Sequence, residues 1–558
     1  MNVVDTELYL EPCKYYQNIL KQAHLDNIDA CLDELVKKSG IDVEGNKVTV
    51  EAYNKAVKES EEYSKKISKN NALSSFLLFL GILLAVAIIG IFILVYRHNT
   101  LKNKIKTLQE EKDRIDKRRD ELLQEAKNQV APLLALFDDE IAIRLAEKTA
   151  PLLDFDERCE PSRIERMVNQ FGYEEDDDED HSTLVVQSGE LNGNPFVLKQ
   201  TYVMNMYDEP FTGSLLITWT TVEHTENGSR TVTHTQTLYA TIYKPVPHYS
   251  VQTTLTLTSD AAPKLSFSRS PAGMAGLSEK EVEKRVKKFE KEDQKRAEKA
   301  IKKGQSYTKM ANSKFEAFLN SSDRNNEVEY RLLFTPLAQN NICYLFSQDK
   351  PYGDDINYVK NGCVNTIYSS HSMNMDYSGG AYNYTSYSYE EIKDKFTKYN
   401  ASFFQAIYYD FLLYLSIPMF QQHSSAPYLG EGPKYARNVS IYEAEALVNK
   451  LEYETLKHKD SSTNTILKTT IMNKGKDYDE IEVEAHSYKA IPDIEYVPTM
   501  GGDGHMHMVP VPYSIYKPLI RTTSFTIYKN AVPKGTENNI MEYRKLTLVS
   551  KDNKKETK

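Results

Sequence analysis

The chain has 558 residues, of which 40% are hydrophobic and 11% aromatic, so it can build large cores and disorder is not its default state. Its 79 acidic and 69 basic residues give a net charge of −10, which argues against a general nucleic-acid-binding protein, because phosphate recognition needs a basic surface. A disulfide framework and a CxxC metal motif are also not indicated, because the five cysteines lie far apart, at Cys13, Cys31, Cys159, Cys343 and Cys363.

Residues 1–72 are predicted to form a helical head. Apolar residues recur at spacings of three and four, as in Ile28, Leu32 and Leu35, and Ser39-Gly40 marks a break between two helices. A segment of this size is too small for much chemistry of its own.

An uncharged apolar segment follows at residues 73–96. Its 24 residues include 17 Leu, Ile, Phe or Val side chains, and a helix of that length, at about 1.5 Å per residue, crosses a hydrocarbon core of roughly 30 Å. The sequence therefore predicts one transmembrane helix and a single-pass location in the cell membrane, with a buried core helix as the less favoured alternative. Four Lys or Arg residues lie close to the segment on each side, and a wider window adds more of them on the C-terminal side than on the N-terminal side, which favours a cytoplasmic C-terminal region.

Residues 97–181 are predicted to be a helical stalk that ends in an acidic linker. From Leu101 to Ala126, apolar residues alternate at spacings of four and three, which is a heptad seam. Lys112 and Arg119 occupy two of its positions. Two alternatives fit this pattern: a weak coiled coil, through which two copies would associate, and a single solvated helix.

Two features divide the end of this stalk. Pro132 is predicted to begin a second amphipathic helix, which Pro151 ends. The seven carboxylates of residues 174–180 are predicted to be a solvated linker, because the turn glycines and ligand spacing of a calcium site are missing.

Residues 182–275 are predicted to form an antiparallel β-rich region. Short runs alternate Thr with Val-like residues, and Asn227-Gly228 between two of these runs is a signal for a type I′ hairpin. The only tryptophan, Trp219, lies in one of the runs and is predicted to belong to the core.

Residues 276–304 are predicted to be a charged helix. Ser278 and Glu281 make a capping box, and Gly304 supplies a stop. Acidic and basic residues alternate around a narrow apolar stripe, which is typical of a solvated helix.

Residues 305–528 are predicted to be an α+β region, followed by a tail at 529–558. A strand is expected at 330–334 and a buried helix in the segment 396–420, which Pro418 ends and where Gln405 and Asp410 argue against a second membrane span. Together these elements predict an α+β fold class for the chain.

The sequence holds one local group of metal-ligating residues. Asp503, His505 and His507 could offer one carboxylate and two imidazoles from one strand face. The favoured interpretation is a glycine turn that enters a strand, because a third or fourth ligand is not placed by the sequence. His371 and His423 are candidates for it, with positions that the sequence does not constrain.

Catalytic motifs are missing. The chain has no P-loop, no GxGxxG, no HExxH, no GxSxG and no EF-hand loop, so an enzyme is not indicated and no cofactor is expected. Asp354 and Asp355 follow a turn, as acid–base or Mg²⁺ chemistry would require, but Asp and Gly are common in ordinary turns, which is the favoured interpretation.

Six sequence blocks of the C-terminal part carry a resemblance. They are NGNPF at 192–196, TGSLLITW at 212–219, QTLYATIYKP at 236–245, KLSFSR at 264–269, YRLLFTPLAQN at 330–340 and HMVPVPYSIYKPL at 507–519. Through them the chain resembles uncharacterised single-pass bacterial membrane proteins, in outline over residues 10–525. The resemblance implies a bacterial origin and a membrane-tethered soluble domain, and it implies no activity, cofactor or site residue.

The leading hypothesis from the sequence is a membrane-anchored structural or interaction protein, whose partners are other proteins or a second copy bound through the stalk helix. The alternative is a membrane-anchored enzyme with an unrecognised site formed by Asp354, Asp355, His505 and His507. A transporter or channel is disfavoured, because one span cannot enclose a pore.

Overall fold

The computed structural model describes residues 3–83, 88–175, 178–225, 228–302, 309–422, 439–451, 453–529, 540–543 and 546–550. It is 47% helical and 31% strand, which confirms the α+β class. The chain divides into two compact units. Unit 1 comprises residues 1–20, 150–378 and 405–558, and unit 2 comprises residues 21–149 and 379–404.

Unit 2 is helical. Its elements are α3 (Lys21–Ser39), α4 (Val43–Leu83), α5 (Ile88–Tyr96), the π-helical turn η2 (Arg97–Leu101), α6 (Lys102–Leu134), α7 (Ile141–Thr149), the 3-10 turn η3 (Ala381–Tyr384) and the first part of α14 (Tyr389–Leu415). The predicted stripe Ile28 and Leu32 of α3 packs against Val130 and Leu133 of α6 and Phe396 of α14. This buried cluster is the core of the unit.

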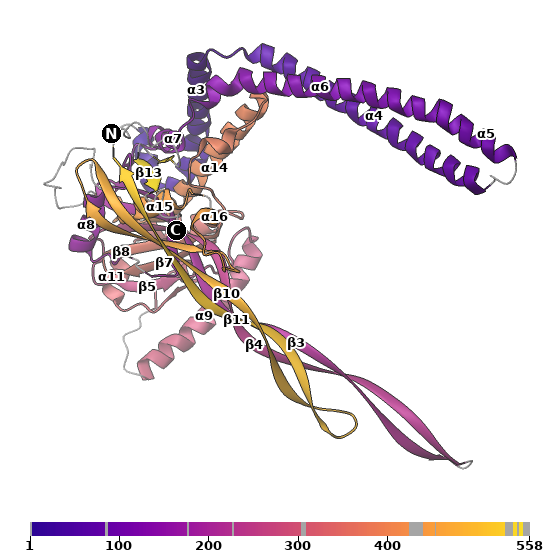
Figure 1. Cartoon of the computed structure of the whole chain (residues 1–558). Helices are drawn as coiled ribbons and strands as arrows, with labels where there is room; N and C mark the ends of the chain where they lie inside the picture. The colour runs from indigo at the N-terminus through magenta and orange to yellow at the C-terminus, as the bar shows by residue number, and fades with distance from the viewer. Residues whose placement is uncertain are drawn as a thin grey trace. The chain divides into compact units, whose positions relative to one another are not determined.

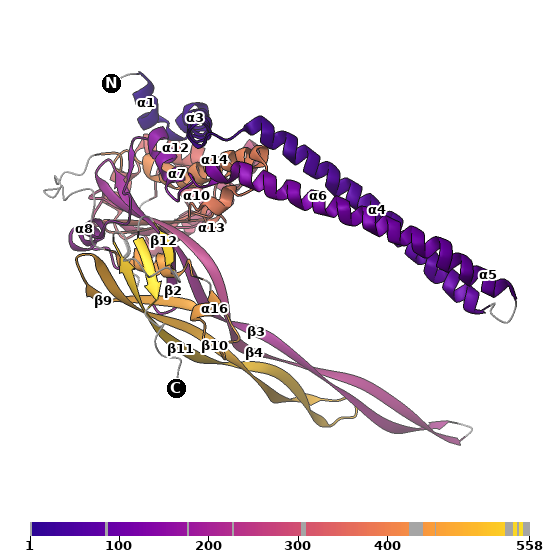
Figure 2. The same cartoon turned by 45° about the horizontal axis from the view of Figure 1, so that its top comes forward.

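Helices α4 and α6 lie side by side as an antiparallel hairpin (Figures 1 and 2). On α4, buried residues recur at intervals of seven: Ser60, Ile67, Ser74 and Gly81. On α6, Leu122 and Ala126 are buried, and Asp116 accepts a hydrogen bond of 2.5 Å from the Ser60 hydroxyl. The heptad seam predicted for 101–126 is therefore covered by a helix of the same chain.

The prediction of a transmembrane helix at 73–96, and with it of a single-pass location in the cell membrane, is wrong. Within the residues that the structure describes, no helix combines the length and the apolar character that a membrane crossing requires. The apolar segment is divided between the end of α4 (73–83) and α5, with residues 84–87 outside the described part. At about 1.5 Å per residue the two pieces are roughly 17 Å and 14 Å long, well short of roughly 30 Å.

Contacts between the two pieces explain why the segment folds back. At Gly81 an added Cβ would lie 2.7 Å from the side chain of Leu94 and 3.5 Å from the carbonyl oxygen of Gly90, so the missing side chain lets α5 lie close to α4. Arg97 then donates from Nε to the carbonyl oxygen of Ser74 at 2.8 Å and to its hydroxyl at 3.0 Å. Hydropathy predicted a lipid environment for this segment but did not show that its two halves contact each other.

The expected helix start at Pro132 is also not observed. Helix α6 continues through Pro132 to Leu134, and the break comes later, at residues 135–140. There the carboxylate of Asp138 accepts a hydrogen bond of 2.9 Å from the backbone N–H of Glu140, just before α7 begins.

Unit 1 contains helices and two antiparallel sheets. Its helical elements are α1 (Val3–Leu10), α2 (Pro12–Tyr15), the π-helical turn η1 (Tyr16–Leu20), α8 (Pro161–Phe171), α9 (Glu279–Lys302), α10 (Ser313–Leu319), α11 (Glu327–Leu333), α12 (Pro336–Phe346), α13 (Ser370–Met373), the second part of α14, α15 (Ile441–Val448) and α16 (Tyr453–Leu456). Helix α9 begins as predicted, since Glu281 Oε2 accepts a hydrogen bond of 3.0 Å from the backbone N–H of Ser278.

The larger sheet, sheet A, has the order β1-β2-β3-β4-β8-β7-β5-β6. Its strands are β1 (Leu153–Phe155), β2 (His181–Leu191), β3 (Asn194–Thr225), β4 (Gly228–Thr258), β5 (Ser266–Arg269), β6 (Ser321–Ser322), β7 (Ile356–Asn361) and β8 (Val364–Ser369). Helix α14 packs on this sheet. The Tyr414 hydroxyl donates to the carbonyl oxygens of Leu255 and Asn365 at 3.1 and 2.7 Å, and the rings of Phe411 and Phe196 lie 4.9 Å apart.

The second sheet, sheet B, has the order β12-β13-β11-β10-β9. Its strands are β9 (Ile466–Lys474), β10 (Tyr478–Met500), β11 (Met506–Tyr528), β12 (Ile540–Tyr543) and β13 (Leu546–Ser550). Part of the segment expected to be a tail thus forms strands, and β13 pairs with β11.

Two long hairpins extend together from unit 1, β3/β4 and β10/β11 (Figures 1 and 2). Strands β3 and β4 have 32 and 31 residues and pair as far as Thr225 opposite Gly228, which confirms the predicted hairpin, although residues 226–227 lie outside the described part. The hairpins share a core in which Ile217 and Leu238 pack against Val511. We call the outer part of the two hairpins, which contains this shared core, the β arm.

The strand predicted at 330–334 is a helix instead. Residues 327–333 form α11, whose first turn is capped by Asn326, the side chain of which accepts a hydrogen bond of 3.1 Å from the N–H of Glu329. Tyr330 and Leu333 face the core at helical spacing, and this tertiary burial outweighs the strand preference of an aromatic and aliphatic run.

Candidate functional site

The predicted metal-ligating residues lie at the turn between β10 and β11. The structure brings Asp503 and His507 together, with His507 Nε2 2.9 Å from Asp503 Oδ2. The backbone N–H of His505 donates to Asp503 Oδ1 at 3.0 Å, which is the main reason that the pKa of this carboxyl lies below its ordinary value, while the His505 side chain is exposed. Among the described residues no group of three His, Cys, Asp or Glu side chains is arranged to hold a metal, so metal binding at this turn stays a prediction.

The carboxylates of Asp354 and Asp355 both make ionic contacts, that of Asp354 fully buried and that of Asp355 partly buried. Asp354 pairs with Arg269, with both side chains fully buried, and its Oδ2 accepts a hydrogen bond of 2.8 Å from the backbone N–H of Met274. Asp355 Oδ2 lies 2.8 Å from His371 Nδ1. No hydrogen bond or ion pair in the described chain joins these aspartates to His505 or His507, so the four residues of the proposed enzyme site are not brought together.

His371 lies between two carboxylates. Its Nε2 is 3.3 Å from Asp410 Oδ1, while Nδ1 contacts Asp355. Burial by itself lowers the pKa of the imidazole, but the charges and hydrogen bonds of Asp410 and Asp355 outweigh burial and raise this pKa to about 10. His371 is therefore an imidazolium inside the fold at neutral pH, which suits a structural ion pair more than a proton-transfer group.

An exposed apolar surface covers the end of the α4/α5 hairpin in unit 2. Phe76, Phe79 and Phe92 are 58%, 67% and 70% exposed, although phenylalanine is normally buried. Further exposed side chains on the same two helices are Leu73, Ile82, Leu83, Ile91 and Val95. We call these eight residues the apolar tip. No residue from 73 to 96 carries a charge.

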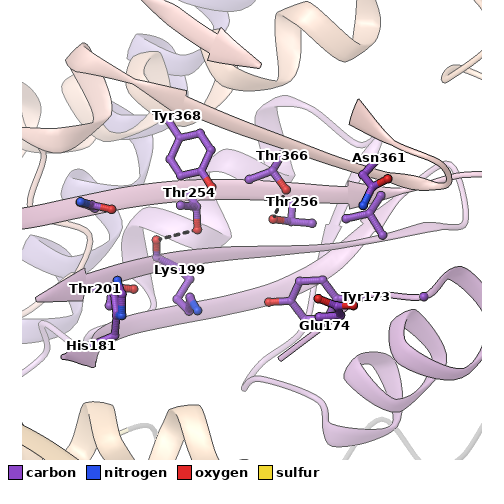
Figure 3. A pocket seen from close by; sticks show the side chains of 13 residues that line it. Tyr173, Glu174, His181, Lys199, Thr201, Thr254, Thr256, Asn361, Thr366 and Tyr368 are labelled. Carbon is purple, nitrogen blue, oxygen red and sulfur yellow. Dashed lines mark hydrogen bonds between the residues drawn. The ribbon is translucent and has the colours of Figure 1, made fainter. Parts of the chain in front are cut away.

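A polar pocket of about 320 Å³ lies on sheet A in unit 1 (Figure 3). Its floor is formed by β3, β4 and β8, whose register places Lys199 opposite Thr254 and Thr254 opposite Tyr368. In the neighbouring row Thr256 and Thr366 lie opposite each other, with their hydroxyl oxygens 3.2 Å apart.

The wall of the polar pocket comes from a different part of the chain. Tyr173 and Glu174 follow the end of α8, where Gly172 has a φ of +74° that lets the backbone leave the helix. His181 at the start of β2 borders the pocket beside Thr201 (Figure 3). The floor is well enclosed, since Lys199 and Thr201 are only 7% and 4% exposed.

Sequence reasoning missed the polar pocket. The alternation of polar residues was visible in the strand runs, with Lys199 and Thr201 in one and Thr254 and Thr256 in another. What the sequence does not state is that these strands are neighbours and that β8, more than a hundred residues later, lies beside them.

Comparison with known proteins found no relative, because the sequence matches no protein-family model, no curated protein and no solved structure.

Proposed function

We propose that this chain is a structural or interaction protein and that its apolar tip binds the apolar tip of a second copy. The observation that carries the proposal is the exposure of Phe76, Phe79 and Phe92 on two helices whose residues from 73 to 96 include no charged side chain. Monomeric proteins rarely expose a contiguous apolar patch of this kind, because its burial releases about 25 cal/mol for each Å² removed from water.

The arrangement of the tip suits a second hairpin. On α4, Phe76, Phe79 and Leu83 follow the spacing of three and four that marks one helix face, and on α5 Ile91 and Val95 do the same. Two such hairpins placed face to face form a four-helix bundle, and a twofold contact requires only that the surface complement itself. Because the apolar tip has no charge, the tips of two copies do not repel each other electrostatically.

The heptad seam of α6 is not the contact that we propose. Its buried members Leu122 and Ala126 already pack within the hairpin, so association through them would require α4 to leave. The apolar tip lies on the outer surface of the same hairpin and needs no such rearrangement.

Sedimentation velocity of the full chain over a range of concentrations tests the proposal. We expect the wild-type protein to form dimers and a variant with both Phe79→Ser and Phe92→Ser to be monomeric. Val328→Ser is the matched control, because Val328 is 69% exposed on α11 and lies outside the apolar tip. Because the contact is apolar, the dimer should persist at high salt.

Two outcomes would contradict the proposal. One is a wild-type chain that stays monomeric at every concentration. The other is a monomer that binds lipid vesicles or a different protein through the tip, with loss of that binding in the double variant, because the tip would then have another occupant.

A further inference from the structure

The polar pocket of unit 1 is a different site from the apolar tip of unit 2, and its lining identifies a class of ligand. We propose that this pocket binds a neutral, hydroxyl-rich small molecule of about the size of one monosaccharide. The argument rests on an unsatisfied buried hydroxyl, on the balance of charge around the pocket, and on its aromatic border and size.

The hydroxyl of Thr201 is the clearest sign that the pocket accepts a ligand. Thr201 is 4% exposed, and its Oγ1 is a buried polar atom without a hydrogen-bond partner in the described structure. Buried polar groups are nearly always paired, because an unmade hydrogen bond costs about 1–3 kcal/mol. Thr201 lines the pocket beside Lys199 (Figure 3), so this unpaired hydroxyl belongs to the pocket floor.

The charges around the pocket favour a neutral ligand. Among the described lining residues, the charged groups are the ammonium of Lys199 and the carboxylate of Glu174, and His181 also lines the pocket. An anion attracted by Lys199 would be repelled by Glu174, and a cation attracted by Glu174 would be repelled by Lys199. In each case the repulsion would offset part of the attraction. The Lys199 ammonium also lies 5.2 Å from the centre of the Tyr442 ring, which further satisfies its charge within the fold.

The remaining polar lining groups are hydroxyls and amides. They are Thr201, Gln252, Thr254, Thr256, Asn361 and Thr366. A hydroxyl or an amide can both donate and accept hydrogen bonds, as the hydroxyl groups of a sugar require. A ligand made mostly of hydroxyl groups therefore matches these partners better than a ligand with one fixed charge does.

The aromatic border and the size complete the assignment. The rings of Tyr173 and Tyr368 lie at the edge of the pocket, where they can cover the C–H face of a sugar ring. The volume of about 320 Å³ is at the lower end of the range for small-molecule sites, about 300–1,000 Å³, and so admits one ring-sized ligand.

Calorimetric titration of the full chain tests this inference. The neutral probes are glucose, galactose and N-acetylglucosamine, and the charged probes are inorganic phosphate, acetate and glucosamine. We expect one or more neutral sugars to bind and the charged probes to bind more weakly. Thr201→Val keeps the shape and removes the hydroxyl, so it should weaken sugar binding about tenfold. Thr237→Val is the matched control, because Thr237 is an exposed threonine on the part of β4 that lies in the β arm, outside the pocket.

Each adverse result overturns the inference in a distinct way. Wild-type protein that binds no neutral sugar, or that prefers a charged probe, would refute the class of ligand. Binding that Thr201→Val leaves unchanged would refute the site. If thermal unfolding shows that Thr201→Val does not fold, Thr254→Val, at a half-buried position on the same floor, takes its place. Variants of the apolar tip should bind sugar normally, so failure of the proposed dimer leaves this test unaffected.

Discussion

The backbone of Gly81 lies directly against the side chain of Leu94, so close that a Cβ at position 81 would be 2.7 Å from Leu94 Cδ2 and 2.8 Å from its Cγ. This contact holds the two pieces of the apolar segment together. A glycine inside a helix costs about 1 kcal/mol relative to alanine, and here that cost is offset by the close packing of α4 on α5.

Substitution of Gly81 should separate the two helices. Gly81→Leu places a large side chain where Leu94 already lies, and we expect overpacking of about 1–3 kcal/mol that opens the hairpin end. Hydrogen exchange of the amides in α5 should become faster. Ser75→Leu, at an exposed position of the same helix, is the control and should leave this exchange unchanged. Equal exchange in both variants would contradict the close contact.

The buried Arg269–Asp354 pair should be important for the stability of unit 1. Asp354→Asn leaves the guanidinium of Arg269 buried without its counter-charge, and we expect the free energy of unfolding to fall by about 3–5 kcal/mol. Glu292→Gln is the control, because its pair with Lys288 spans 3.9 Å between largely exposed side chains and should contribute at most about 0.5 kcal/mol. Urea unfolding measures both changes, and similar losses in the two variants would show that burial of the first pair has no special effect.

His24 should make unit 2 sensitive to acid. Its Nδ1 lies 2.8 Å from the Thr149 hydroxyl and its ring stacks on Phe404 at 4.1 Å, and burial lowers its pKa from 6.5 to about 4. Between these two pH values the unfolded chain binds the proton more readily, so the contribution of neutral His24 is complete above pH 6.5 and is lost as the pH falls toward 4. The variant His24→Gln should flatten the dependence of stability on pH in this window, whereas His505→Gln, at an exposed position, should not.

His371 should have the opposite effect in unit 1. Its pKa is raised to about 10 in the folded chain, so the folded state holds the proton between pH 6.5 and 10 and the unfolded state releases it. Stability from this ion pair is complete below pH 6.5 and should be lost as the pH rises toward 10. Urea unfolding of wild type and His371→Gln across this range should show an alkaline loss in the wild type that the variant lacks. A variant with the same alkaline slope would show that another group causes it.

Local features of the fold were predictable because their causes are local. The capping box of Ser278 and Glu281, the hairpin signal at Asn227-Gly228 and the helical stripe of Ile28 and Leu32 each depend on residues a few positions apart. The strand predicted at 330–334 was wrong although the cause of the helix is also local, since the side chain of Asn326 accepts a hydrogen bond from the N–H of Glu329 in the first turn of α11.

Partners distant in the sequence were not predictable. Hydropathy showed that residues 73–96 are apolar but not that Gly81 would contact Leu94, and the seam of α6 gave no sign that α4 would cover it. The floor of the polar pocket was not predictable for the same reason, because it forms only where Thr254 pairs with Lys199 on one side and with Tyr368 on the other. Sequence periodicity predicts which face of a helix or strand a residue lies on, whereas the strand that pairs with it is determined by the whole fold.

The β arm and the polar pocket are built from the same two backbones. Strand β3 passes through Lys199 and Thr201 at the pocket floor and continues to Thr225 near the end of the arm, and β4 returns from there to Thr254. The pairing of the two strands continues without a register shift from the pocket floor to Thr225 opposite Gly228, so the floor and the arm are parts of one hydrogen-bonded ladder.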